Sequence, residues 1–136
     1  MKIFDCFMYF DEDVVLDVRL NTLDEYVDHF VIVESTFTHK GEKRDLKFDI
    51  KKFLKFKKKI IYLVYKENPH ELKSINKQDS EDEKSVKYIT NAILRENGQR
   101  NFIIEGLTMA NNEDLILISD LDEIPNLDNI NFKSIK

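Results

Sequence analysis

The sequence predicts an α/β domain, in which a mostly parallel sheet carries helices on its faces. Four short apolar runs are typical of strands that are buried on both faces. Segments with helical spacing or helix-capping residues separate these runs, and such alternation favours parallel strands joined by right-handed crossovers. The length of 136 residues fits a single domain, 1–136, and 42% hydrophobic residues exclude a disordered chain.

The first half of the chain provides two predicted strands with a helix between them. Residues 2–10 form an apolar and aromatic run that predicts the first strand. Acidic residues at 11–13 are suited to cap a helix from residue 13 to about residue 27. Its inward face repeats at helical spacing through Leu16, Leu20, Leu23 and Val27. Residues 30–33 predict the second strand, and residues 35–47 lack periodicity and predict a loop.

The second half predicts two more strands and a long helix. Asp49 can cap a short helix, and residues 60–65 predict the third strand. Ser80 and Glu83 have the spacing of a capping box, so a long helix is expected from there to about residue 107, with Gly98 as its weak point. Residues 114–119 predict the fourth strand. The expected apolar face of the long helix consists of Ile89, Ile93, Ile103 and Leu107.

Composition and a few single residues exclude some classes of protein. A net charge of −5 argues against a nucleic-acid-binding domain, and no segment reaches the ~18 apolar residues of a membrane span. Cys6 is the single cysteine, so no internal disulfide forms, and it is expected to be a core residue. Asp5 lies in an apolar strand and requires a buried partner. These features predict a cytoplasmic protein.

The strongest functional signal is the acidic segment 119–125, Ser-Asp-Leu-Asp-Glu-Ile-Pro, directly after the fourth strand. Residues two apart in extended chain point the same way, so Asp120 and Asp122 can place both carboxylates on one side, with Leu121 turned into the core. Hard oxygen ligands suit Mg²⁺ or Mn²⁺, which bind substrate phosphates as well. The alternative is a solvated acidic turn. Ligands of parallel sheets bind at the carboxyl ends of strands, and this favours the metal site.

Two other positions, Glu34 and Arg100, are weaker candidates. Glu34 ends the second strand, where a carboxylate could accept hydrogen bonds from a ribose or base, or lie in water. Arg100 on the long helix could reach a diphosphate, whereas surface charge is the simpler interpretation of Arg95. His39 lies in the loop after the second strand and is expected to be inert.

Segments spread over the chain resemble glycosyltransferase family 17, the β-1,4-mannosyl-glycoprotein β-1,4-N-acetylglucosaminyltransferases. They are residues 3–10 (Ile-Phe-Asp-Cys-Phe-Met-Tyr-Phe), 19–21 (Arg-Leu-Asn), 27–35 (Val-Asp-His-Phe-Val-Ile-Val-Glu-Ser), 38–41 (Thr-His-Lys-Gly), 95–96 (Arg-Glu), 99–101 (Gln-Arg-Asn) and 118–125 (Ile-Ser-Asp-Leu-Asp-Glu-Ile-Pro). Together these matches are far more specific than the acidic pair alone.

The resemblance implies a Rossmann-like, glycosyltransferase A-type fold. It further implies a UDP-sugar donor, UDP-N-acetylglucosamine by analogy, a divalent cation (Mn²⁺ or Mg²⁺), a glycan or glycoprotein acceptor, and inversion at the anomeric carbon. By this resemblance Asp120 and Asp122 are the metal and diphosphate site, and Glu34 lines the nucleotide pocket. Because family members are longer, the chain is expected to be the truncated, nucleotide-binding half, without the acceptor-binding half; the catalytic residue is unknown.

Two alternatives stay open. A non-catalytic nucleotide-sugar-binding or assembly module would use an uncovered sheet edge to pair with a partner, including a second copy in a homo-oligomer. A metal-dependent phosphotransferase with an Asp-x-Asp nucleophile pair is weaker, because such enzymes typically place the pair after the first strand, not the fourth.

Overall fold

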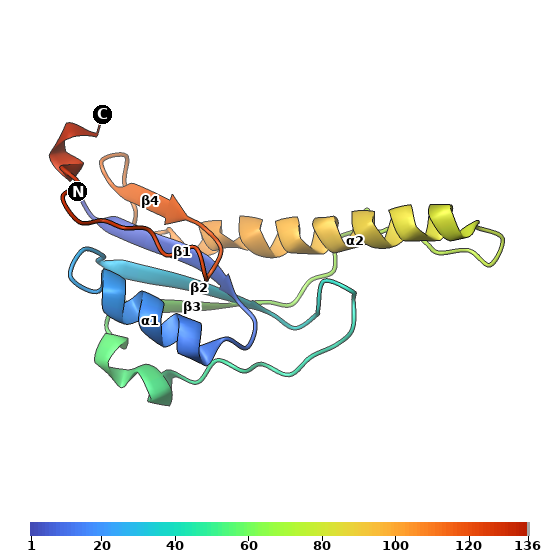
Figure 1. Ribbon diagram of the computed structural model, residues 1–136, viewed down its shortest axis with the longest axis horizontal. Helices are drawn as coiled ribbons and strands as arrows, with labels where there is room; N and C mark the ends of the chain where they lie inside the picture. The colour runs from blue at the N-terminus through green and yellow to red at the C-terminus, as the bar shows by residue number, and fades with distance from the viewer. Residues whose placement is uncertain (136) are drawn as a thin grey trace.

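The apolar runs of the sequence form one four-stranded parallel sheet. In the computed structural model, which describes residues 1–135, the strands are β1 (Ile3–Tyr9), β2 (His29–Ser35), β3 (Ile60–Tyr65) and β4 (Leu115–Ile118). Their order in the sheet is β3-β2-β1-β4, and every neighbouring pair is parallel (Figure 1). The predicted α/β, Rossmann-like class is therefore confirmed.

Helices cover both faces of this sheet. The helix α1 (Asp13–Leu23) and the 3₁₀ helix η1 (Ile50–Phe56) pack on one face, through a core that includes Phe7, Leu20 and Phe53. The helix α2 (Glu81–Asn101) runs into the 3₁₀ helix η2 (Phe102–Gly106), which packs on the other face. A last 3₁₀ turn, η3, spans Phe132–Ser134.

β1 lies in the middle of the structure and is buried on both faces. Side chains alternate along a strand, so Phe4 and Cys6 face the η2 side, whereas Phe7 faces α1. Cys6 is fully buried, as the sequence predicted. Asp5 also faces α1, and its carboxylate pairs with the guanidinium of Arg19 at 2.8 Å. The structural ion pair expected of Asp5 is thus confirmed, and the structure identifies its partner.

α1 begins at Asp13 as predicted, but its capping and its end differ from the sequence prediction. Glu12 occupies the N-cap position, but its carboxylate accepts from the backbone N–H groups of Phe10 and Asp11 and leaves the helix without a side-chain cap. The helix ends at Leu23, four residues earlier than expected, and a tight turn brings Val27 back into the core. The predicted capping by the acidic residues 11–13 was therefore wrong.

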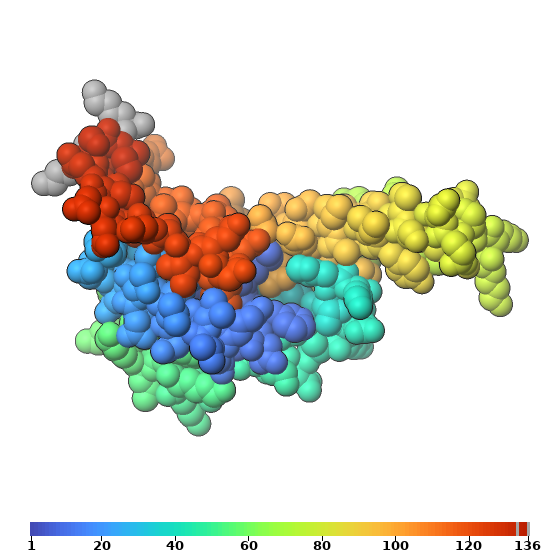
Figure 2. Space-filling view, viewed as in Figure 1, coloured from blue at the N-terminus to red at the C-terminus, as the bar shows by residue number. Residues whose placement is uncertain are grey.

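α2 begins as predicted, with the complete capping box between Ser80 and Glu83. Of its expected apolar face, Ile89 and Ile93 were wrong, because they are 62% and 50% exposed. Ile103 and Leu107 do pack in the core, although they lie in and just after η2. The first part of α2 extends beyond the sheet, so only its last turns reach the core (Figures 1 and 2). Gly98 is explained by this packing, since a Cβ there would collide with the hydroxyl of Tyr65.

The strand order determines where a ligand can bind. The chain proceeds from β1 outward to β2 and β3, then returns through α2 to β4 on the opposite side of β1. The order therefore reverses between β1 and β4, with Cys6 opposite Ile118 in the register. In open parallel sheets such a switch point opens a crevice beyond the carboxyl ends of the strands. The acidic segment after β4 lies at this crevice.

Candidate functional site

An open pocket of about 790 Å³ lies at the carboxyl edge of the sheet. The ends of β1, β2 and β4 and the segments after them contribute residues 8–10, 35, 37–40 and 120–122 to its lining, and α2 adds Glu96 and Gln99. The segment after β3 does not take part, because β3 is at the far edge of the sheet. Three of the four strand ends therefore meet in one pocket at the carboxyl edge, where ligands of parallel sheets bind, and this pocket has the size of a small-molecule site.

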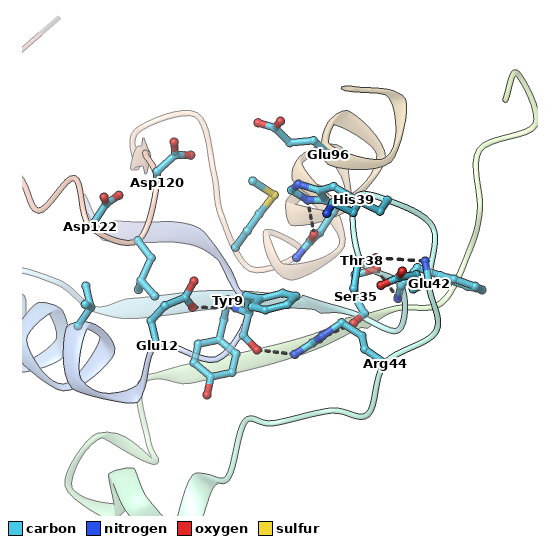
Figure 3. Close-up of a pocket in the computed structure, with 17 residues that line it drawn as sticks. Tyr9, Glu12, Ser35, Thr38, His39, Glu42, Arg44, Glu96, Asp120 and Asp122 are labelled. Atoms are coloured by element: carbon cyan, nitrogen blue, oxygen red, sulfur yellow. Dashed lines mark hydrogen bonds between the residues drawn. The ribbon is translucent and has the colours of Figure 1, made fainter. Parts of the chain in front are cut away.

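The two aspartates of the acidic segment share one side of this pocket. A turn after Ile118 projects both carboxylates in the same direction, toward the open space (Figure 3). Leu121 between them is 6% exposed and packs in the core, as the alternation predicted. Asp120 is half exposed, whereas Asp122 is exposed, so both remain accessible to a ligand.

Arg100 adds a positive charge beside the acidic pair, next to Asp120. One nitrogen of its guanidinium, Nη2, lies 2.9 Å from Asp120 Oδ1 and 2.9 Å from Glu96 Oε1. A cationic group thus lies directly beside Asp120. The sequence named Arg100 as a candidate, and the structure brings it to Asp120 across twenty residues of chain.

The donor set limits the kind of cation that fits. In residues 1–135 no group of three or more His, Cys, Asp or Glu side chains converges in the way a complete metal cage requires. Asp120 and Asp122 can supply two carboxylates, and the other ligands would have to come from water or a substrate phosphate. Mg²⁺ and Mn²⁺ accept this arrangement, since they retain waters and bind oxygen ligands.

The surroundings of Glu34 differ from those expected of a residue that binds a nucleotide. It is fully buried, and its carboxylate accepts from the backbone N–H groups of Lys47 (2.6 Å) and Phe48 (3.1 Å). It also accepts from Arg44 Nη2 at 2.9 Å and from the Tyr62 hydroxyl at 2.7 Å. Burial and then this hydrogen bond raise the pKa of Tyr62. Both carboxylate oxygens of Glu34 accept hydrogen bonds from other residues of the chain. Glu34 therefore affects the pocket through the residues that it binds.

Arg44 is one of those residues, and the sequence analysis did not identify it. Its guanidinium donates to the carbonyl oxygens of Ser35 (2.6 Å) and Phe10 as well as to Glu34. Its Cζ atom also lies 4.4 Å from the centre of the half-exposed Phe10 ring. Arg44 thereby joins the ends of β1 and β2 at the wall of the pocket. A single arginine in an aperiodic loop carries no local pattern that would have identified it.

The loop after β2 is held against α2 by a second set of contacts. Gln99 is buried, donates to the Val33 carbonyl at 2.9 Å, and approaches His39 Nε2 at 3.4 Å. Arg95 donates to the His39 carbonyl at 3.0 Å, and a Cβ at Gly41 (φ 91°) would collide with its guanidinium. His39, expected to be inert, therefore lines the pocket. For Gln99 the available signal was its place beside Arg100 in the family-like segment.

Comparison with known proteins identifies the class of this protein. Residues 1–135 match the model of a glycosyltransferase family, a class of enzymes that transfer a sugar from a donor to an acceptor. The family is glycosyltransferase family 17, and the chain belongs to it. No curated protein and no solved structure matches the sequence. Within residues 1–135, every helix is too short or too polar to cross a membrane.

Proposed function

We propose that the pocket binds a UDP-sugar, UDP-N-acetylglucosamine, together with Mn²⁺ or Mg²⁺, for transfer of the sugar to a glycan acceptor. The observation that carries this proposal is the shared position of Asp120 and Asp122. Both line one pocket, on one side, at the point where the strand order of the sheet reverses. Membership of a glycosyltransferase family supports the choice of a sugar nucleotide over other phosphorylated ligands.

Each group near the acidic pair has a role in this proposal. Asp120 and Asp122 hold the cation, which when bound neutralises charge on the departing diphosphate. Arg100 lies 2.9 Å from Asp120 and can donate to a phosphate oxygen from the same place. Glu96, which lines the pocket, pairs with Arg100 at 2.9 Å and holds its guanidinium beside Asp120, at the margin of the pocket. These residues form the phosphate end of the proposed donor site.

The opposite part of the pocket is suited to the nucleoside. Phe10 is half exposed at its wall, and Arg44 covers one face of the ring. Ser35 and Thr38 add hydroxyl groups from the end of β2 and the following loop. An aromatic face with nearby hydrogen-bonding groups suits a base and a ribose.

Calorimetric titration with UDP and Mn²⁺ tests the donor site. Wild-type protein is expected to bind UDP more tightly with Mn²⁺ than without it, and Asp122→Ala is expected to lose this dependence. Asp128→Ala is the matched control, since Asp128 is an exposed carboxylate nearby in the chain and does not line the pocket. Absence of binding by folded protein, or unchanged affinity in Asp122→Ala, contradicts the proposal.

The uncovered edge of β4 favours a second candidate, a donor-binding module that assembles with a partner or a second copy. β4 pairs with β1 on one side, is only partly buried, and ends at Ile118, which is 55% exposed. Exposed strand edges pair with other chains. Light scattering distinguishes this candidate, since a strictly monomeric chain counts against it. Hydrolysis or transfer of a UDP-sugar by the chain alone refutes its non-catalytic form.

A further inference from the structure

Arg19 is a buried arginine in contact with the acidic turn. It lies on α1 and is 0% exposed, although arginine is rarely buried unless it is paired. Its Nε and Nη2 atoms donate to the two oxygens of Asp5, both at 2.8 Å, in a bidentate ion pair. Asp5 therefore neutralises the charge and orients the guanidinium. The remaining N–H groups are free to bind something else.

Those remaining N–H groups all point to the turn after β4. Nη1 lies within hydrogen-bond distance of three carbonyl oxygens, those of Asp120 (2.7 Å), Leu121 (3.0 Å) and Glu123 (3.3 Å). Nη2 donates to the Ser119 hydroxyl at 2.7 Å. The guanidinium of Arg19, which α1 carries, thus binds four acceptor oxygens within the five residues 119–123.

The turn adds its own hydrogen bonds to this arrangement. The Ser119 hydroxyl donates to the Glu123 carbonyl at 3.0 Å, and the Glu123 N–H donates to the Asp120 carbonyl at 3.0 Å. The Asp120 N–H donates to the Glu123 carboxylate at 3.2 Å. Because the carbonyl groups converge on Arg19, the backbone between Ser119 and Glu123 is fixed, and the two aspartate side chains are directed into the pocket.

We propose that Arg19, oriented by Asp5, is a positioning residue that pre-forms the Asp120–Asp122 pair for its cation and diphosphate. It acts through the backbone of the turn and does not line the pocket. This inference rests on the proposed function for the ligand, but the fixed turn itself does not. Residues that orient metal ligands typically change metal affinity 10- to 100-fold when replaced.

Arg19→Lys is the informative variant, because it keeps the positive charge beside Asp5. A lysine carries three donors on one nitrogen and cannot reproduce the planar fork of five N–H groups. We expect Mn²⁺-dependent UDP affinity to fall about tenfold or more, and hydrogen exchange in peptides covering residues 119–123 to become faster. Ser119→Ala removes the two hydrogen bonds of the Ser119 hydroxyl, from Arg19 and to the Glu123 carbonyl, and keeps the buried Arg19–Asp5 ion pair. It should show the same two effects to a smaller extent.

Leu23→Ala is the control for a general loss of stability. Leu23 is fully buried on the same helix, and its side chain makes no hydrogen bond to the turn. The Leu23→Ala variant should lower the free energy of unfolding, while its UDP affinity and its hydrogen exchange in residues 119–123 stay unchanged. The inference is overturned if Arg19→Lys keeps wild-type UDP affinity and wild-type hydrogen exchange in residues 119–123. It is also overturned if Leu23→Ala changes this affinity and this exchange as much as Arg19→Lys does. If wild-type protein does not bind UDP with Mn²⁺, the proposed function fails, and the exchange measurement still decides whether Arg19 fixes the turn.

Discussion

Replacing Glu34 by glutamine should strongly destabilise the fold, because its carboxylate accepts four hydrogen bonds in a buried site. Glutamine retains one accepting oxygen and places an NH₂ group where the other oxygen accepted two donors. The change also leaves Arg44, whose side chain is 8% exposed, without its counter-charge. Breaking a buried ion pair costs about 3–5 kcal/mol, a large part of a typical 5–15 kcal/mol stability.

Glu96→Gln provides a matched control within the same chain. In both pairs an arginine Nη2 atom lies 2.9 Å from a glutamate Oε1 atom, Arg44 with Glu34 and Arg100 with Glu96. The pairs differ in burial, since both side chains of the Arg100–Glu96 pair are 39% exposed. Solvent-exposed pairs of this kind contribute roughly 0–1 kcal/mol. The same substitution should therefore have a cost several times larger at Glu34.

Urea unfolding at pH 7, followed by circular dichroism, measures both costs from the shift in midpoint at equal slope. We expect Glu34→Gln to lower the free energy of unfolding by about 3 kcal/mol or more, and Glu96→Gln by about 1 kcal/mol or less. A loss below about 1 kcal/mol in Glu34→Gln, or equal losses in both variants, would refute the assignment of Glu34 to an internal role. The expectation that Glu34 contacts the nucleotide directly would then regain support.

Two further predictions follow from shifted pKa values, one of a buried thiol and one of a partly exposed carboxyl group. Burial first, and then the charge of Asp5, raise the pKa of the Cys6 thiol to about 12. Native protein should therefore not react with a thiol reagent such as DTNB at pH 8, and reaction before global unfolding would contradict the buried site. The hydrogen bond from Lys52, followed by that from Tyr9, lowers the pKa of Asp13, so its stabilising effect is present above the unfolded pKa of about 3.9 and is lost as pH falls through the lower folded pKa. In urea titrations the stability difference between wild type and Asp13→Asn should be constant near neutral pH and shrink toward pH 3. A difference that does not change with pH would exclude this linkage.

The local features of the fold were accessible from the sequence because they depend on short segments. The apolar runs predicted all four strands, and the Ser80–Glu83 spacing predicted the start of α2. The position of Asp120 and Asp122 after the fourth run placed them at the carboxyl edge of the sheet. Hydrophobic periodicity, capping and alternation act within a few residues, so these patterns can be evaluated without knowledge of distant contacts.

The tertiary structure alone decided which distant groups meet. Asp5 required a partner by its burial, but only the packing of α1 on β1 showed that Arg19 is the partner and that it also reaches residues 119–123. The hydrogen-bond donors to Glu34 belong to residues 44–48 and to β3. Because all of them lie within the fold, this carboxylate stabilises the structure around it. Ile89 and Ile93 had helical spacing, yet α2 extends beyond the sheet and leaves them exposed. The sequence thus determined the strands, the capping box of α2 and the acidic pair, whereas long-range packing determined how each charge is neutralised, because ion-pair partners are set by proximity in space.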